Sequence, residues 1–546
     1  MAGNAPQSSP QSSTHHSTSE PVPPESEAVG PRGSTEASGT GAPETAASGT
    51  GAPETAASGT GAPETGASGT EAPEEDGQRS VSSRTALKWS MLAQGCARAG
   101  QFALGIVLAR ILTPEDYGTY TVALGLFLIL LTFDDLGVVK GLVRWPGSFE
   151  DAAPTARTIG VLSGLVVYAL AFAIAPVIAS IMSAPEATPV IRVLCLGVIL
   201  DAAVQIVPTA SLQRRFRQDL WVIVEFTRIV VLASVTLALA FAGLGVWALV
   251  WGALAGQLSL VVVTTVLARI PMTFGWNRAV AKELLEVSAP YAFAGLVSAV
   301  MLNIDYLVLG RHSGTVEVGI YLIAFNVSSW PTSLVGQSVR AVSIRNFAEL
   351  EQQGADVGRS ARRGLLLLFG GALPFVAVLI AMPELTIGTI YGSEWVSGAH
   401  ALRFLAVLAI VRLVDSLSDD LFFALARPGW ILAKNILWIG LLFVGLNIGA
   451  ALDDVTGVAI AHALIAVLVI LPLICVLLAR LGVWTTRLPV LAGLMTLLGA
   501  VACFVGWLVV THLQTPQFVT LVLGTLSVCV VFAAGLLPFR RHLYIA

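Results

Sequence analysis

A few charged side chains interrupt the long apolar stretches that fill most of this 546-residue chain. Arg412, Asp415 and Asp419 recur at three- and four-residue spacing, so a helix places them in one polar stripe, with Ser416 and Ser418 nearby. A guanidinium can bind a phosphate through two parallel hydrogen bonds, and a carboxylate in apolar surroundings can hold a cation or a proton. Arg412 and Asp415 are therefore candidate substrate contacts, and Asp419 is a candidate for a coupling ion; the alternative is a stripe that serves packing.

Two further arginines stand inside apolar stretches. Arg98 lies about midway along the first stretch, where it could bind a phosphate or pair with a neighbouring carboxylate. Arg228 follows Glu225 by three residues, which is close enough for an ion pair on one helix face. Arg98 and Arg228 are candidate substrate contacts, and a structural ion pair is the alternative for both.

Acidic and amide side chains complete the set of candidates. Asp305 could bind a coupling cation or proton, or pair with an arginine, and Asn303 two residues before it is a candidate substrate contact. Asp134, Asp135 and Asp201 lie nearer to the ends of their stretches, where water access favours structural roles.

Other kinds of site lack the residues that they need. The five cysteines stand alone in apolar surroundings, without paired spacing or neighbouring histidines, which argues against metal and disulfide sites. No GxxxxGK[ST] loop and no Ser/His/Asp set accompanies the charged residues, so ATP hydrolysis and hydrolytic catalysis are not expected. The sequence predicts a transporter rather than an enzyme, with no cofactor, no metal and no nucleic acid as a partner, and with a proton or sodium ion as the candidate coupling ion.

The elements that position these residues are apolar segments of membrane-spanning length. Hydrophobic residues make up 55% of the chain and charged residues 12%, and a helix needs roughly 20 apolar residues to cross the hydrocarbon core. We predict an all-α polytopic membrane protein with about fourteen transmembrane helices, at residues 85–109, 117–139, 158–181, 190–212, 220–243, 245–267, 288–310, 317–339, 364–384, 399–425, 429–450, 456–479, 488–511 and 517–538.

The distribution of positive charge gives an orientation. Under this scheme 24 of the 31 lysines and arginines, including Lys434, fall on the side that holds both termini, four fall on the other side, and three lie within spans. Because cytoplasmic loops are enriched in Lys and Arg, we expect a multi-pass protein of the cell inner (cytoplasmic) membrane with both termini in the cytoplasm and the lipid bilayer as its surroundings.

The first 84 residues form a segment of a different kind. Residues 1–80 carry eleven acidic residues against two basic ones and contain no Leu, Ile, Phe, Trp or Tyr, so they cannot build a core. The ten-residue repeat ASGTGAPETA begins at Ala37 and again at Ala47. We predict a disordered, acidic cytoplasmic tail rich in Pro, Gly, Ser, Thr and Ala over residues 1–84.

An internal repeat predicts two similar halves. Val107, Leu108, Arg110, Gly118, Tyr120 and Ala123 recur 201 residues later as Val308, Leu309, Arg311, Gly319, Tyr321 and Ala324. Six predicted helices separate the copies, which favours two six-helix lobes around a central cavity, with two helices appended. The lobes are residues 85–267 and 288–479, and the appended helices are residues 488–538. Two lobes with a site between them indicate transport by alternating access.

Three sequence segments resemble one transporter family. RILTPEDYG followed by a helix and DLGVVKGLVR at 110–144, LQRRFR at 212–217, and NIDYLVLGR with GIYLIAFN at 303–326 are similar to prokaryotic polysaccharide exporters of the Wzx type. These belong to the multidrug/oligosaccharidyl-lipid/polysaccharide flippase superfamily. The resemblance covers about residues 85–481, and the long repeat-bearing tail departs from it.

The resemblance implies a cargo. It implies a flippase for a lipid-linked oligosaccharide or polysaccharide precursor, with an undecaprenyl-pyrophosphate-linked glycan as substrate and polysaccharide-assembly proteins as candidate partners. Export of lipopolysaccharide or exopolysaccharide material is the expected role. The alternatives are an ion-coupled multidrug exporter or a lipid II flippase of the same superfamily and, ranked lower, a membrane glycosyltransferase or polymerase.

Overall fold

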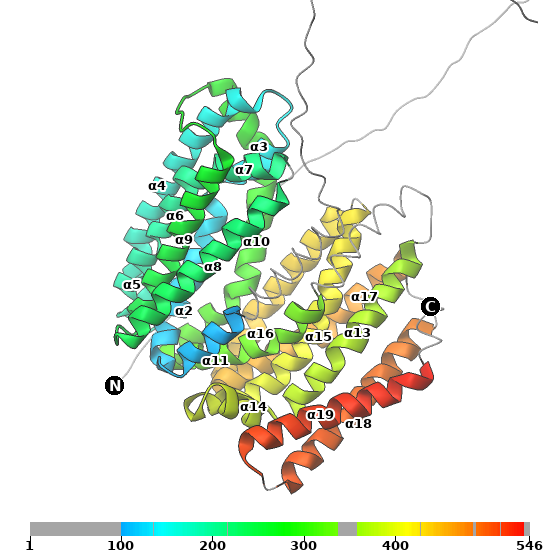
Figure 1. Ribbon diagram of the computed structural model, residues 1–546. Coiled ribbons are helices and arrows are strands. Elements are labelled where there is room, and N and C mark those ends of the chain that lie inside the picture. Colours follow the sequence, from blue (N-terminus) through cyan, green and yellow to red (C-terminus); the bar gives the residue numbers. More distant parts are fainter. Residues whose placement is uncertain are drawn as a thin grey trace, which may run out of the picture. The chain divides into compact units, whose positions relative to one another are not determined.

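The computed structural model describes residues 100–134, 136–215, 217–336, 357–425, 427–483, 487–513 and 515–539, and this part of the chain is helical, with no strand (Figure 1). The predicted tail of residues 1–84 and the candidate Arg98 lie outside the described residues. The helical class predicted from the apolar segments is confirmed for the described ranges.

The first half of the chain contributes a helical segment and the elements up to α11. They are Gly100–Ala109, α2 (Pro114–Asp134), α3 (Val138–Val143), α4 (Phe149–Ile181), α5 (Ala187–Leu194), α6 (Leu196–Leu200), a π-helical turn (Asp201–Gln205), α7 (Ile206–Arg214), α8 (Gln218–Phe241), α9 (Val246–Ala268), α10 (Arg278–Ser313) and α11 (Thr315–Ser328).

The second half continues from a π-helical turn after α11. Its elements are that turn (Thr332–Gly336), α13 (Val357–Ala381), α14 (Pro383–Ile390), a 3₁₀ helix (Ser393–Gly398), α15 (Ala399–Ala424), α16 (Pro428–Ile465), a π-helical turn (Ala466–Ile470), α17 (Leu471–Arg480), α18 (Arg487–His512), α19 (Gln517–Leu536) and a 3₁₀ turn (Leu537–Phe539). α18 and α19 pack against each other along the chain's last described part, and α18 also packs on α13 (Figure 1).

Several of these elements are long and apolar enough to cross a bilayer. Within the described ranges there are eight such candidates: Phe149–Ile181, Ala187–Arg214, Leu220–Phe241, Val246–Ala268, Gly358–Ala381, Pro428–Arg480, Leu488–His512 and Gln517–Leu536. The stretch Pro428–Arg480 corresponds to two predicted spans, because the backbone leaves helical geometry at Asp453 and Asp454. The number of fourteen crossings therefore stays a prediction.

Two helices begin about ten residues before the predicted spans. α4 starts at Phe149 instead of 158, and α10 starts at Arg278 instead of 288. The Asn277 side chain caps α10 by accepting hydrogen bonds from the backbone N–H groups of Ala279 and Val280. The added turns of α10 carry exposed charged residues such as Lys282 and Glu286, so hydropathy alone does not detect them.

The segment that joins α9 to α10 is bonded to α4. Thr158 Oγ1 donates to the carbonyl of Gly275 at 2.8 Å, and the Asn277 N–H donates to Thr155 Oγ1 at 3.2 Å. Arg157 Nη1 donates to the carbonyls of Pro271 at 3.0 Å and Thr273 at 2.9 Å. These side-chain bonds fix an irregular segment whose carbonyls would otherwise need other partners.

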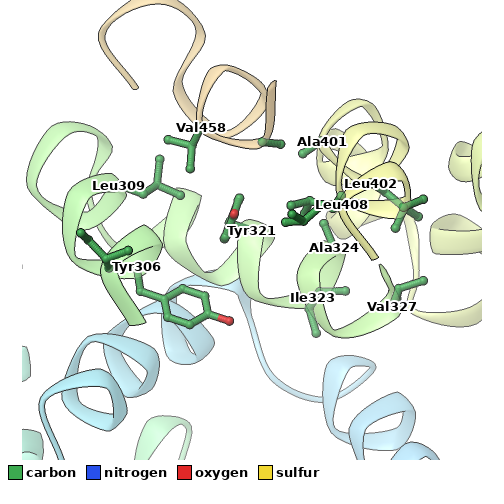
Figure 2. Packing of buried hydrophobic residues seen from close by; sticks show 14 of the residues in the cluster. Tyr306, Leu309, Tyr321, Ile323, Ala324, Val327, Ala401, Leu402, Leu408 and Val458 are labelled. Atoms are coloured by element: carbon green, nitrogen blue, oxygen red, sulfur yellow. The ribbon is translucent and has the colours of Figure 1, made fainter. Parts of the chain in front are cut away.

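The largest buried cluster includes the region where α10, α11, α15 and α16 converge. Figure 2 shows Leu309 of α10, Tyr321 and Ala324 of α11, Leu402 of α15 and Val458 of α16 within it, and all five are fully buried. Small side chains such as Ala324 allow the helices to approach closely, which is how helices associate where lipid supplies no hydrophobic driving force.

α2 and α11 meet at two glycines that are related by the 201-residue offset. A Cβ added to Gly118 would lie 1.7 Å from the Thr315 carbonyl oxygen, and one added to Gly319 would lie 2.1 Å from the Pro114 carbonyl oxygen. Pro114 and Thr315 are themselves 201 residues apart. The contact, called the α2–α11 seam below, is thus reciprocal: each helix places a glycine against the first residue of the other.

Candidate functional site

A lysine bridges the acidic stripe of α15. Lys434 on α16 forms ion pairs with Asp415 and with Asp419, the second with Nζ 2.7 Å from Oδ1. The lysine side chain is fully buried, and those of the two aspartates are 13% and 27% exposed. Lys434, which the sequence analysis counted among the cytoplasmic cations, thus lies inside the helix bundle as the cation of two carboxylates, and its side of the membrane stays a prediction.

Arg412 lies on the same helix but does not join that network. Its guanidinium sits 4.8 Å from the centre of the Phe325 ring on α11, and it forms no ion pair with any described residue. Asp415, three residues along the same helix, is paired with Lys434 instead. A partly exposed guanidinium without a carboxylate partner keeps its hydrogen-bond donors available for another anion.

Asp305 on α10 is the centre of a second buried cluster. Its Oδ2 accepts hydrogen bonds from the Tyr321 hydroxyl at 2.6 Å and from the His462 ring at Nδ1, 2.8 Å away. Asp305 Oδ1 is buried and has no partner within the described residues. Asn303 is also buried, and its amide donates to the Ala299 carbonyl of its own helix at 2.9 Å, so this bond holds the side chain along α10.

An aromatic group connects Arg412 to the Asp305 cluster. The ring of Phe325 stacks on Tyr321 with centroids 6.0 Å apart and meets Tyr306 edge to face at 6.1 Å (Figure 2 shows the two tyrosines). Tyr321 binds Asp305, and Phe325 carries Arg412 on its face. The structure thus brings Arg412 and Asp305 to the same aromatic group from α15 and α10, 107 positions apart in the sequence.

The other candidates lie elsewhere. Arg228 and Glu225 form the ion pair expected from their spacing, at 2.8 Å on α8. Asp201 accepts a hydrogen bond from Gln257 Nε2 at 2.5 Å, which joins its π-helical turn to α9. Asp135 and the side chain of Asp134 lie outside the described residues.

The end of the molecule that carries α14 is tied across the α2–α11 seam. Arg110 donates to the carbonyls of Thr389 at 2.5 Å and Ile390 at 3.1 Å. Trp395 Nε1 donates to the Ala109 carbonyl at 2.9 Å. These bonds hold Ala109 and Arg110 against residues about 280 positions later in the sequence. The Arg110 guanidinium is a charged donor, and the carbonyls that it binds belong to the last two residues of the short helix α14.

Three residues of the two clusters were missed by the sequence analysis. Lys434 lies close to a predicted span end and was grouped with interfacial cations. His462 is a single histidine in an apolar stretch, and Tyr321 entered only as a member of the repeat. The available signal was the polarity of Lys434 and His462 inside apolar spans, where polar groups need partners.

Comparison with known proteins identifies the family. Residues 107–400 match the family described as polysaccharide biosynthesis protein. The chain is 24% identical over 401 residues to the lipopolysaccharide biosynthesis protein WzxC of Escherichia coli (strain K12), which covers 70% of this chain and 78% of that protein. It is 23% identical over 342 residues to the succinoglycan biosynthesis transport protein ExoT of Rhizobium meliloti (strain 1021), and the alignment covers 61% of this chain and 67% of that protein.

A solved structure shares the fold. The lipid II flippase MurJ in its inward closed conformation matches with a TM-score of 0.69 at 13% identity, covering 83% of this chain and 100% of that chain. The family match spans more than half of the sequence and includes the segments that carry the resemblance to polysaccharide exporters. This multi-pass membrane protein belongs to the polysaccharide biosynthesis protein family.

Proposed function

We propose that the protein is a flippase that moves a lipid-linked oligosaccharide or polysaccharide precursor across the cytoplasmic membrane. The observation that carries this proposal is the family match over residues 107–400 in a chain built of membrane-spanning helices. A charged sugar-diphosphate head cannot cross hydrocarbon without losing its water, whereas a prenyl tail can remain in lipid. A polar path between helices solves this problem without chemical change to the cargo.

Two lobes of six helices, 85–267 and 288–479, around a central cavity are the architecture that we propose for this transport, with 488–538 appended. The reciprocal contact of Gly118 and Gly319 supports it, because residues related by the 201-residue offset meet as a pseudo-two-fold pair. In this scheme the seam is at the external side and closes the path there. The lobes then alternate by opening the seam and closing the opposite end.

The proposed topology has fourteen crossings and both termini in the cytoplasm. Single cysteines placed at Gly314 and Thr456 in a cysteine-free background should react with an impermeant maleimide added to intact cells. A cysteine at position 352 should react only after the membrane is opened. Labelling of position 352 in intact cells would reverse the orientation and with it the assignment of the seam to the outside.

Arg412 is the residue that we propose to contact the cargo. It lacks an anionic partner among the described residues, it is partly exposed, and it sits on an aromatic face that orients the guanidinium. An undecaprenyl-pyrophosphate-linked glycan supplies the missing anion, and a diphosphate accepts two parallel hydrogen bonds from one guanidinium. Arg98 and Arg228 remain proposed contacts of the same kind in the lobe of residues 85–267, and Asn303 and Asp415 remain proposed contacts in the lobe of residues 288–479.

Binding measurements test this role. Arg412→Gln removes a charge-assisted contact worth roughly 1.5 to 3 kcal/mol, which corresponds to about ten- to a hundredfold weaker binding. Binding of an undecaprenyl-pyrophosphate-linked oligosaccharide should be measured per monodisperse protein recovered, with lipid II as the competing cargo. Arg311→Gln, an exposed arginine in the last turn of α10, is the matched control. Equal affinity of the two variants would remove Arg412 from the site.

The coupling ion that we propose is a proton held by the Asp305 cluster, with Asp419 as the second candidate. Asp305 Oδ2 contacts the Tyr321 hydroxyl and the His462 ring, and its Oδ1 has no partner within the described residues, so a carboxylate and an imidazole lie in contact inside the membrane part, as in proton relays of pumps and transporters. Sodium would require several oxygen ligands instead. In proteoliposomes an imposed pH gradient should drive transport, and Asp305→Asn should abolish that dependence. Stimulation by a sodium gradient alone would contradict the assignment.

A further inference from the structure

A polar pocket lies at the end of α4, α7 and α9 that is opposite to the seam in the proposed topology. It has a volume of about 610 Å³ and forms where the first turns of α4, the end of α7 and the segment after α9 meet. Its charged and hydroxyl lining consists of Glu150, Ser211, Arg214, Arg215, Arg269 and Thr273. Three guanidinium groups against one carboxylate leave a positive net charge.

The three arginines are not neutralised by described residues. Arg214 donates to the Trp145 carbonyl at 3.3 Å and lies 5.8 Å from the centre of the Phe149 ring, so it is positioned without being paired with an anion. Arg215 and Arg269 are exposed and form no ion pair with the described part of the chain. The pocket therefore presents donors that lack an anionic acceptor.

Two buried polar side chains lie at the wall of the same pocket. Ser211 lines the pocket at 2% exposure, and its hydroxyl has no hydrogen-bond partner within the described ranges. Behind the wall, Arg157 is 1% exposed and bonds through Nη1 to the carbonyls of Pro271 and Thr273, which also line the pocket. A buried hydroxyl without a partner is costly, so a ligand oxygen at this position would stabilise it.

Arg269 holds its place in an unfavourable backbone conformation. It ends α9 at φ 51° and ψ 37°, in the left-handed region that glycine adopts without steric cost. An arginine at this cap is therefore the poorer choice for the fold. A ligand bound by the Arg269 guanidinium in the pocket would offset this backbone cost.

We propose that this pocket binds the phosphate of an anionic lipid headgroup at the membrane surface. Arginine forks match phosphate oxygens, a hydroxyl adds a further donor, and the volume exceeds what a bare phosphate fills. The phosphate can come from a bilayer phospholipid or from the diphosphate of a polyprenyl-linked glycan. The proposal does not depend on transport, because it requires only the pocket and its charges.

Lipid retention in native mass spectrometry tests the site on the full-length protein. Phosphatidylglycerol should be retained over phosphatidylcholine, and the double variant Arg215→Gln/Arg269→Gln should weaken this retention about tenfold or more. Arg480→Gln, which replaces an exposed arginine at the end of α17 outside the pocket, is the control for the loss of a surface arginine and should bind as the parent does. Equal retention by the double variant and the control would overturn the proposal.

A single variant separates binding from folding. Arg269→Gly should lower phosphatidylglycerol retention while its thermal unfolding temperature stays equal or rises, because glycine suits the backbone of this cap. Undecaprenyl diphosphate and inorganic phosphate, each added as a competitor, identify the source. Pocket-dependent displacement by undecaprenyl diphosphate but not by inorganic phosphate supports the cargo lipid. No displacement by undecaprenyl diphosphate supports the phospholipid. Displacement by inorganic phosphate at equal concentration would show that the lipid portion adds nothing and overturn a headgroup site.

Discussion

Gly319→Ala should open the α2–α11 seam. The added Cβ would lie 2.1 Å from the Pro114 carbonyl oxygen, whereas ordinary Cβ contacts begin at 3.4 Å. The two backbones must therefore separate by about 1.3 Å, since neither atom belongs to a flexible side chain that could move away. In the proposed scheme this separation favours the state that is open to the outside.

The size of the expected shift follows from the hydrogen bonds that Trp395 and Arg110 form next to the seam. A displacement of about 1.3 Å stretches the 2.9 Å bond from Trp395 to Ala109, and the two bonds from Arg110 to the carbonyls at the end of α14, beyond hydrogen-bond range. At about 1 kcal/mol each, the three bonds contribute roughly 3 kcal/mol to the closed state. Their loss shifts the equilibrium toward the open state by about a hundredfold.

Distance measurements between spin labels report this shift. Labels at Glu186 and Ser397, both exposed and on opposite sides of the seam, should show a longer distance in Gly319→Ala than in the parent. Gly440→Ala, in α16 with no atom near its added Cβ, is the control and should leave the distribution unchanged. An unchanged distribution in Gly319→Ala, with the parent's thermal stability, would refute the steric reasoning.

Three further predictions concern stability and the tail. Lys434→Met should destabilise the protein by about 3 to 5 kcal/mol in thermal unfolding in detergent, because Asp415 and Asp419 lose their buried cation. Adding Asp415→Asn to this variant should restore part of the lost stability. An unchanged stability of Lys434→Met would show that the ion pairs do not stabilise the fold. Asp305→Asn should cost about 1 to 3 kcal/mol in the same assay, because an amide replaces a carboxylate that accepts two buried hydrogen bonds; parental stability would contradict that role. Deletion of residues 2–80 should leave transport per inserted molecule near normal, since a segment of this composition cannot pack on a membrane-embedded site. Loss of transport with normal insertion would show that the tail is required for transport.

Local patterns in the sequence predicted the helical class and local contacts well. Apolar length identified α8, α9, α18 and α19 within a few residues, because membrane-spanning helices must satisfy their own backbone hydrogen bonds. The pairing of Arg228 with Glu225 followed from helix geometry alone. The resemblance to polysaccharide exporters was confirmed by the family match.

Contacts between side chains that are far apart in the sequence could not be predicted from the sequence. His462 lies 157 residues from its partner Asp305, and no periodicity relates them. Lys434 sits six residues inside α16, where hydropathy cannot separate an interfacial lysine from a buried one. The early start of α10 was missed because its first turns carry charge, so their helical structure depends on the Asn277 cap rather than on apolar length.

The bonds that tie residues 271–277 to α4 also limit where the chain can bend between its halves. A connection between two moving halves is usually assumed to bend along its whole length, but here Arg157 and Thr158 hold it through Gly275. The segment must then travel with α4 as one rigid piece. The first turns of α10 are held as well, because Ala281 and Leu284 are buried in one cluster with Ala152, Ala153 and Ala156 of α4. In the proposed transport scheme, α10 can therefore move against α4 only by bending farther along its 36 residues, beyond Leu284.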